Sequence, residues 1–166
     1  MTSLWKPSVT VAAVAERDGR FLLVEEVTAD GVRLNQPAGH LDPGESLLAA
    51  AAREALEETA FSFTPKQLVG VYLWRSEPSP AGNAVTYLRF AFSGDLGAFD
   101  ARRPLDHGIL RALWLTRAEL AGRRTEHRSP LVQRCVDDYL SGKRFPLELI
   151  HTHPSALSDV VPADAR

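Results

Sequence analysis

Two runs of apolar residues near the start of the chain predict buried β-strands. Residues 9–15 are almost entirely apolar, and residues 20–28 hold a second apolar run at 21–24. Between them lies Asp18-Gly19, a dipeptide typical of a tight hairpin turn. A short strand end is expected at 34–37, before a loop that contains glycine.

Residues 46–59 predict the first helix. Pro43 and Gly44 precede it, and Ser46 is suited to be its N-cap. Small and apolar side chains share one side of this helix, so we expect that side to pack closely on a sheet. They are Leu48, Ala51, Ala52 and Ala55. The acidic residues of the same segment are expected on the side away from them.

The rest of the chain predicts three further strands and two further helices. The strands are expected at 68–75, 86–93 and 109–115, with a loop at 76–83 and irregular structure at 94–107. Thr116 is expected to cap a short helix that reaches Glu119, and Ser129-Pro130 to begin a final helix that ends at Gly142.

This order of elements predicts an α+β domain, an α/β/α sandwich in which a mixed central sheet packs between helices. A chain of 166 residues is expected to form one domain, which we assign to residues 1–153. Residues 154–166 are rich in Pro, Ser, Ala and Asp and are expected to be a flexible tail.

Charge and cysteine content narrow the classes of partner. The formal net charge of -2 gives no general attraction to nucleic acid or to an anionic membrane, so we expect neither a polymer nor a membrane as partner. No apolar run is long enough to span a membrane, and residues 1–6 lack the apolar core of a signal peptide. The single Cys135 lies in an apolar pattern and fits a reducing cytoplasm.

Three carboxylates share one face of the first predicted helix. Glu54, Glu57 and Glu58 fall at positions i, i+3 and i+4, where like charges repel one another. A hard cation such as Mg²⁺ prefers oxygen ligands and would explain the cluster. A solvated acidic face without any metal explains the same spacing, so the residues alone leave both interpretations open.

The stretch around these glutamates resembles a known motif. Gly39 is followed after five residues by Glu45, and after seven more by Arg53-Glu54; Glu57-Glu58 and Phe61 complete the pattern. The stretch resembles the Nudix box, whose charged positions are all matched at their spacings. Two positions depart from it: Ala60 stands where the family has glycine, and Ala55 is a small version of an aliphatic position. The first departure concerns the turn at the end of the helix, where glycine accepts a positive φ without strain.

Segments outside the box are similar to the NudJ-like phosphatase branch of the Nudix superfamily. They are residues 6–14, 35–41, 88–90, 128–132 and 141–150, and the resemblance covers roughly residues 6–150.

The resemblance implies an α/β/α Nudix fold and a hydrolase that cuts the diphosphate linkage of a small-molecule phosphoanhydride. Nucleoside di- and triphosphates and small organic diphosphates, such as the pyrimidine diphosphates of thiamine synthesis, are the implied substrates. The implied cofactor is Mg²⁺, with Mn²⁺ as a substitute, which neutralises phosphate charge and activates a water molecule. The protein is expected to act as a monomer or a homodimer.

The resemblance also implies roles for individual residues. The expected metal ligands are the Gly39 carbonyl and the side chains of Glu54, Glu57 and Glu58. Arg53 is expected to orient these acids through salt bridges, and Glu45 to fasten the loop to the helix. The general base is expected to be a box glutamate or Asp106 in the later loop, where Asp106 is also a candidate metal ligand. His40 is expected to hold the turn.

Substrate contacts are expected from strand residues near the loop. Arg89 alternates off the apolar face of its strand and is the expected phosphate partner, although a surface arginine without a ligand explains the same position. Gln36 and Arg33 are expected to line the pocket beside Asn35. An aromatic ring of the substrate would stack on Trp74 or Tyr87, although an aromatic side chain is more often part of a core.

Two non-enzymatic hypotheses remain beside the hydrolase. A catalytically silent Nudix-fold protein would bind a ligand as a sensor, and an acidic helix with no metal would have a purely structural role. The first would be expected to carry degraded box glutamates, which this chain does not have.

Overall fold

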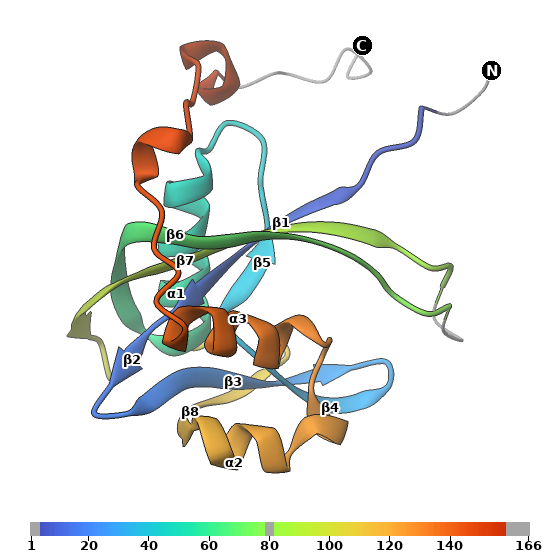
Figure 1. Ribbon diagram of the computed structural model, residues 1–166, viewed down its shortest axis with the longest axis vertical. Coiled ribbons are helices and arrows are strands. Elements are labelled where there is room, and N and C mark those ends of the chain that lie inside the picture. Colours follow the sequence, from blue (N-terminus) through green and yellow to red (C-terminus); the bar gives the residue numbers. More distant parts are fainter. Residues whose placement is uncertain (1–3, 79–81, 159–166) are drawn as a thin grey trace.

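A computed structural model describes residues 4–78 and 82–158. Eight strands, three α-helices and three 3₁₀ turns follow one another in these ranges (Figure 1). The strands are β1 (Ser8–Val14), β2 (Glu16–Arg17), β3 (Arg20–Thr28), β4 (Gly31–Asn35), β5 (Ala38–His40), β6 (Phe61–Arg75), β7 (Thr86–Phe99) and β8 (Ile109–Thr116). The helices are α1 (Leu47–Thr59), α2 (Arg117–Gly122) and α3 (Leu131–Leu140), and the 3₁₀ turns are η1 (Arg124–Glu126), η2 (Leu147–Leu149) and η3 (Pro154–Leu157).

The strands form two four-stranded sheets. The mixed sheet has the order β5-β1-β7-β6, in which only β1 and β7 run parallel. The antiparallel sheet has the order β2-β3-β4, with β8 on the other side of β3. The predicted α+β class and mixed sheet are confirmed, and the second sheet adds to them.

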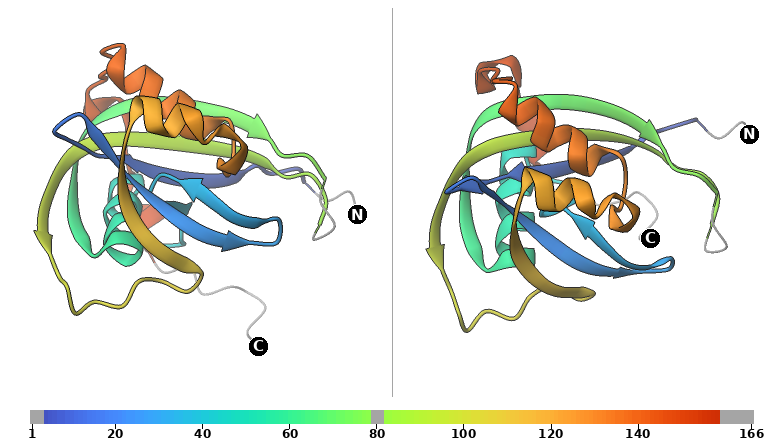
Figure 2. Two further views of the ribbon diagram at one scale, coloured as in Figure 1. Left: turned by 90° about the horizontal axis from the view of Figure 1, so that it is seen from below. Right: turned by 60° about the horizontal axis from the view of Figure 1, so that its bottom comes forward.

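Helices cover the strands from opposite sides. Figure 2 shows α2 and α3 together on one side of the strands and α1 on the other. One apolar cluster joins α3 to the mixed sheet through residues such as Ala12, Ala91 and the fully buried Cys135. A second cluster joins α1 to both sheets through its alanines, Leu22 and Phe92. The site described below lies at the border of these layers because α1 and β5 meet there.

The predicted starts and caps of most elements are confirmed. The Asp18-Gly19 turn has positive φ at both residues, as a two-residue hairpin requires. Thr116 caps α2 with a capping box that includes Glu119, although the helix continues to Gly122. The final helix begins directly after Pro130, and Gly142 after its end has φ +86°.

Two predictions of local structure are wrong. Residues 94–107 were expected to be irregular, but β7 continues to Phe99; likewise β6 begins at Phe61 and not at residue 68. Pro65 sits inside β6, opposite Gly94 of β7, where the register of the pair shifts. A bulge accommodates a residue that cannot donate a ladder hydrogen bond, so the proline did not end the strand.

The C-terminal segment returns to the α1 side of the mixed sheet. Phe145 exchanges two backbone hydrogen bonds of 2.9 Å with Leu68 of β6. Beyond it, Leu147 and Ile150 pack against the α1 cluster. Of the predicted tail, residues 154–157 form η3, and residues 159–166 lie outside the described part of the chain.

Candidate functional site

The helix α1 begins and ends as its sequence predicts. The hydroxyl of Ser46 accepts a hydrogen bond from the backbone N–H of Ala49, at 3.1 Å. At the other end Ala60 adopts the left-handed conformation, with φ 61° and ψ 10°. The turn that glycine makes in the motif is therefore retained by an alanine, and Ala60 accepts the strain of a positive φ.

Two of the three clustered carboxylates face the interior, which corrects the expected placement. Glu54 and Glu58 are 8% and 7% exposed and lie on the buried face of α1 together with Ala51 and Ala55. Glu57 is more open to solvent. The acidic side of α1 is thus not opposite its packed side, because α1 lies against β5 as well as against the larger strands.

Arg53 ties the helix to the loop before it. Its guanidinium donates to both carboxylate oxygens of Glu45, at 3.0 and 2.8 Å, and to the backbone carbonyl of His40, at 3.0 Å. It also donates to Glu54 at 2.7 Å and to Glu57 at 3.1 Å. These contacts raise the pKa of Arg53, and the same hydrogen bonds lower the pKa of Glu45.

Glu45 has the geometry of a fastening residue. Besides its two bonds to Arg53, its carboxylate accepts the backbone N–H of Asp42 at 2.8 Å. The carboxylate of Glu45 therefore connects the loop before α1 to the helix itself.

Gly39 lies directly against one of the acids. A Cβ atom built on Gly39 would stand 2.2 to 2.4 Å from the carboxylate atoms of Glu54. Only glycine lets the β5 backbone and this carboxylate approach so closely.

Glu58 is a buried acid whose charge has no cation against it. Its carboxylate accepts the backbone N–H of Ala38 at 2.9 Å, and within the described ranges no Lys, Arg or His pairs with it. Burial, together with the charges of Glu54, Glu26 and Asp106, raises the pKa of Glu58 to about 8. Burial also raises the pKa of Glu54, although Arg53 opposes the shift.

The donor chemistry of this group suits a hard divalent cation. Its atoms are all carboxylate or carbonyl oxygens, and a cation would offset the buried charge of Glu58. Across residues 4–78 and 82–158, however, no three His, Cys, Asp or Glu side chains are arranged as a metal-binding set. Arg53 holds one oxygen of Glu54 and one of Glu57, which accounts for their arrangement.

Two acids from outside the helix join the group. The backbone N–H of Asp106 donates to the carbonyl of Glu57 at 2.9 Å, which places the loop before β8 at the end of α1. The charge of Asp106 acts on both Glu54 and Glu58. Glu26, whose charge acts on Glu58, was not singled out by the sequence, because its only signal is its place beside Glu25 after the apolar run of β3.

The expected phosphate partner is buried. Arg89 is 7% exposed and donates to the side-chain oxygens of Gln36 and Asn35, both at 3.4 Å. The amide of Asn35 in turn donates to Glu26 at 3.2 Å, so a chain of contacts leads from Arg89 to the acidic group. Arg33 does not join it, because its guanidinium donates to the carbonyl of Val32.

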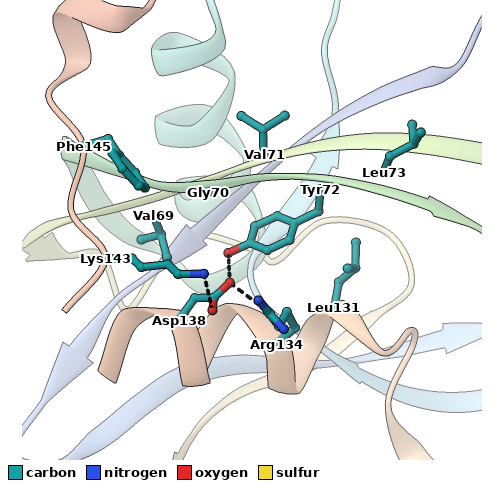
Figure 3. Close-up of a pocket in the computed structure, with 10 residues that line it drawn as sticks. All are labelled: Val69, Gly70, Val71, Tyr72, Leu73, Leu131, Arg134, Asp138, Lys143 and Phe145. Atoms are coloured by element: carbon teal, nitrogen blue, oxygen red, sulfur yellow. Dashed lines mark hydrogen bonds and ion pairs between the residues drawn. The ribbon is translucent and has the colours of Figure 1, made fainter. Parts of the chain in front are cut away.

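Two cavities have linings that include none of the acids of this group. One of about 480 Å³ lies between β6 and α3, where Figure 3 shows the side chains of Tyr72, Arg134 and Lys143 converging on Asp138. These three residues donate to Asp138 at 3.1, 2.9 and 2.9 Å, so its charge is compensated. Another of about 450 Å³ lies beyond the end of α1 and is lined by aromatic rings, including Phe99.

The aromatic pair considered for stacking is formed within the protein. Trp74 and Tyr87 stack on each other across β6 and β7, with ring centroids 5.7 Å apart. Both rings are partly exposed, and they lie on the same face of the mixed sheet as Arg89. No helix in the described part of the chain is long and apolar enough to cross a membrane.

The chain is similar in sequence and fold to known proteins. Phosphatase NudJ of Escherichia coli (strain K12) is 39% identical over 147 residues, which cover 89% of this chain and 92% of that protein. A NUDIX hydrolase from Nitrosomonas europaea has a similar structure, with a TM-score of 0.84, 49% identity and coverage of 90% of this chain and 99% of that one. The MutT protein from Methanosarcina mazei Go1 shares the fold, with a TM-score of 0.65 and 22% identity over 85% of this chain and 99% of that one.

The NUDIX domain matches residues 4–135, which include β1 to β8, the acidic helix and its loop. This match spans most of the chain, and the chain therefore belongs to the NUDIX domain family as a hydrolase of the pyrophosphohydrolase and phosphatase type.

Proposed function

We propose that this hydrolase uses Mg²⁺ to cleave the diphosphate linkage of nucleoside di- or triphosphates or of small organic diphosphates. The observation that carries the proposal is the buried carboxyl group of Glu58, which has no partner cation in the described chain. It accepts the N–H of Ala38 and is near enough to Glu54, the acid against Gly39, for that charge to raise its pKa. A buried acid of this kind is stabilised by a bound cation. The similarity to phosphatase NudJ supports the reaction class.

Four groups would hold the metal: the carbonyl of Gly39 and the carboxylates of Glu54, Glu57 and Glu58. When bound, Mg²⁺, or Mn²⁺ in its place, neutralises charge on phosphate oxygens and lowers the pKa of a bound water. Arg53 positions two of these carboxylates by its bonds to Glu54 and Glu57. Glu45 holds Arg53 in turn.

The proton of the attacking water needs an acceptor near the acids. Asp106 is the candidate that the structure favours among residues outside the helix, because its loop is hydrogen-bonded to the end of α1. A box glutamate remains the other candidate. An acceptor within hydrogen-bond reach of the water removes its proton as the bond to phosphorus forms.

Substrate phosphate is assigned to Arg89, with Gln36 as a residue that orients it. Gln36 is 1% exposed, and its amide donates to the carbonyl of Val132 at 2.7 Å, so its oxygen is fixed toward Arg89. Arg33 is kept as an outer contact on β4, beside Glu26 in the register of the sheet. A reducing cytoplasm is the proposed compartment, which the lone buried Cys135 supports.

The substitution Glu57→Gln tests the metal assignment. Glutamine keeps the size and loses the charge, so we expect turnover to fall by about a hundredfold or more. The assay is Mg²⁺-dependent release of orthophosphate or pyrophosphate from a panel of nucleoside phosphates, dinucleotides and thiamine-pathway diphosphates. The exposed Glu148→Gln is the matched control and should keep the parental rate.

Hydrolysis by Glu57→Gln at the parental rate would show that the metal assignment is wrong. Circular dichroism and urea unfolding should show an unchanged fold, because Glu57 is the most open of the three acids. Calorimetric titration with Mg²⁺ distinguishes the two non-enzymatic hypotheses. Heat of binding without turnover would favour a ligand-binding sensor, and the absence of any heat would favour a purely structural helix.

A further inference from the structure

The cavity beyond the end of α1 has the size and lining of a site for a small organic group. Its volume of about 450 Å³ lies within the range of small-molecule pockets, about 300–1,000 Å³. Aromatic and aliphatic side chains form most of its wall, namely Phe61, Phe99, Leu105, Leu110, Ala112 and Trp114. We call this space the α1-end cavity.

Three aromatic rings meet at the α1-end cavity, and one of them is largely open to solvent. Phe61 contacts Phe99 with ring centroids 4.7 Å apart, and Trp114 with centroids 6.2 Å apart. Phe99 is nevertheless 57% exposed, and Leu110 of the same lining is 54% exposed. A hollow bordered by exposed apolar side chains is typical of a binding site and not of a closed core.

The α1-end cavity lies on the same side of the strands as the acidic group. Phe61 and Trp114 of its wall pack against the apolar cluster of α1. Gly39, which lies against Glu54, is paired in the mixed sheet with Val11 of that same cluster. Paired residues of neighbouring strands share a face of the sheet, so the cavity and the acids both belong to the α1 layer.

The wall of the cavity adjoins the acidic group at two points of the chain. Thr59 lines the cavity and directly follows Glu58. Leu105 lines it and directly precedes Asp106, whose N–H is bonded to the end of α1. Consecutive Cα atoms lie about 3.8 Å apart, so an organic group joined to a diphosphate at the acids has the cavity within reach.

Most polar side chains of the wall are already engaged. The hydroxyl of Thr59 donates to a carbonyl of α1, and the carboxylate of Asp100 accepts a backbone N–H of its own loop. The guanidinium of Arg111 is paired with Glu25. Arg103 differs, because it forms no ion pair within the described residues. The wall thus offers apolar contact area and one cation, which suits an anionic ligand that carries a ring.

We propose that the α1-end cavity receives an aromatic ring of the organic group that the substrate's diphosphate carries, and stacks this ring against Phe99. The inference rests on the proposed function for the diphosphate itself. Offset stacking of two aromatic rings adds to the gain from burying their apolar surface. The site therefore selects diphosphates that bear a ring over inorganic pyrophosphate and over diphosphates of aliphatic alcohols.

Two uncleavable probes that differ only by a nucleoside test the proposal by calorimetry in the presence of Mg²⁺. They are methylenediphosphonate and α,β-methylene-ADP. The unmodified protein should bind α,β-methylene-ADP about tenfold or more tightly than methylenediphosphonate, because stacking of a base on an aromatic side chain contributes about that factor. KM for hydrolysis should likewise be lower for a nucleoside diphosphate than for pyrophosphate.

Phe99→Ala removes the exposed ring of the cavity. We expect it to lower the affinity for α,β-methylene-ADP about fivefold or more and not to change the affinity for methylenediphosphonate. Phe145→Ala is the matched control, because Phe145 is also a partly exposed phenylalanine but lines the cavity between β6 and α3. It should bind both probes with the parental affinity.

The fluorescence of Trp114 gives a second measurement that leaves the cavity unchanged. The chain has three tryptophans, and neither Trp5 nor Trp74 lines this cavity. In the double variant Trp5→Phe, Trp74→Phe, binding of α,β-methylene-ADP should quench the emission of Trp114, and methylenediphosphonate should not. Unchanged emission at saturating α,β-methylene-ADP would contradict the proposal, even where Phe99→Ala does not fold.

Equal affinities of the parent for the two probes, or parental affinity for α,β-methylene-ADP in Phe99→Ala, would overturn the proposal. A dimer that Phe99→Ala dissociates without any change in probe binding would assign the cavity to a second copy of the chain and overturn it too. Calorimetry needs no turnover, so the two proposals fail separately. Hydrolysis of the substrate panel with parental affinity in Phe99→Ala rejects the cavity alone. Ring-dependent binding in a protein that hydrolyses nothing keeps the cavity and rejects the enzymatic assignment.

Discussion

At the scale of single residues, Glu58 shows how position changes the chemistry of a side chain. The same carboxyl group on an exposed helix face would be ionised at neutral pH. Here burial and three neighbouring acids raise its pKa to about 8. The folded chain without metal therefore holds a proton on Glu58 at pH values where the unfolded chain has released it.

This proton gives a measurable pH dependence in the metal-free protein. The stabilisation from a raised pKa is complete below the unfolded value of 4.5 and is lost as pH rises through about 8. In EDTA, the free energy of unfolding of the parent should fall relative to that of Glu58→Gln, by up to about 1.4 kcal/mol per pH unit. Urea unfolding of both proteins between about pH 5 and 8.5 measures the difference.

Glutamine does not titrate, so any common pH dependence cancels in this comparison. A difference that stays constant over the range would contradict the raised pKa of Glu58. Saturating Mg²⁺ should reduce the slope, because metal binding displaces the proton.

At the scale of elements, the long pair of β6 and β7 depends on a close backbone contact. A Cβ atom on Gly94 would stand 2.1 Å from the carbonyl oxygen of Thr64 and 2.9 Å from the Cα of Pro65. Both are backbone atoms, which cannot move aside as a flexible side chain can. The bulge that admits Pro65 into β6 is thus matched by the glycine opposite it.

Gly94→Ala should lower the free energy of unfolding by about 2 to 3 kcal/mol, because the methyl group has no space against this backbone. Gly122→Ala is the control: nothing lies within 4 Å of its added Cβ, and its φ is not positive. We expect that variant to be neutral or slightly more stable. Urea unfolding of Gly94→Ala at the parental midpoint would show that the contact is not tight.

Some elements follow from local sequence, and others do not. The helix α1 could be predicted because Ser46, the alanines and the spacing of its acids are all local signals. The start of β6 could not be predicted, because a proline such as Pro65 usually ends a strand. Its partner, Gly94, is distant in the chain. The buried faces of Glu54 and Glu58 were missed for a similar reason: α1 packs against β5, a contact that helical periodicity alone does not show.

The same limit applies to the site. Roles for Arg53, Glu45 and Gly39 could be predicted from the resemblance to the Nudix box, and the contacts of Arg53 and Glu45 agree with the expected salt bridges. The burial of Arg89 depends on the pairing of β7 with β1 and on the loop that carries Gln36, which are tertiary contacts. Alternation along one strand shows which face a residue takes and not what lies opposite it.

At the scale of the whole molecule, ion pairs to the buried Glu25 join the antiparallel sheet to α2. Glu25 of β3 accepts from Arg111 of β8 at 2.6 Å and from Arg123, just after α2, at 2.8 Å. These two guanidinium groups lower the pKa of Glu25 to about 2. Its stabilisation is therefore complete above 4.5 and is lost as pH falls toward 2.

Glu25→Gln should lower the free energy of unfolding at pH 7 by about 2 kcal/mol. Loss of the buried charge of Glu25 is costly, but Arg111 is well exposed, which limits the loss. The difference from the parent should shrink as pH falls from about 4.5 to about 2. Asp95→Asn, which breaks the exposed pair with Lys66, should change stability by less than about 0.5 kcal/mol. A Glu25 variant as stable as the Asp95 variant at pH 7 would contradict the role of the network.

The contacts of Arg53 bear on how the chain folds in the absence of metal. Its single positive charge already bridges Glu45, Glu54 and Glu57, so the repulsion within the helix is partly relieved by the chain itself. We therefore expect the chain to fold without divalent ions, unlike small domains that fold only around their metal. Depletion of divalent ions should then lower the enzymatic activity of the protein and leave the amount of folded protein unchanged.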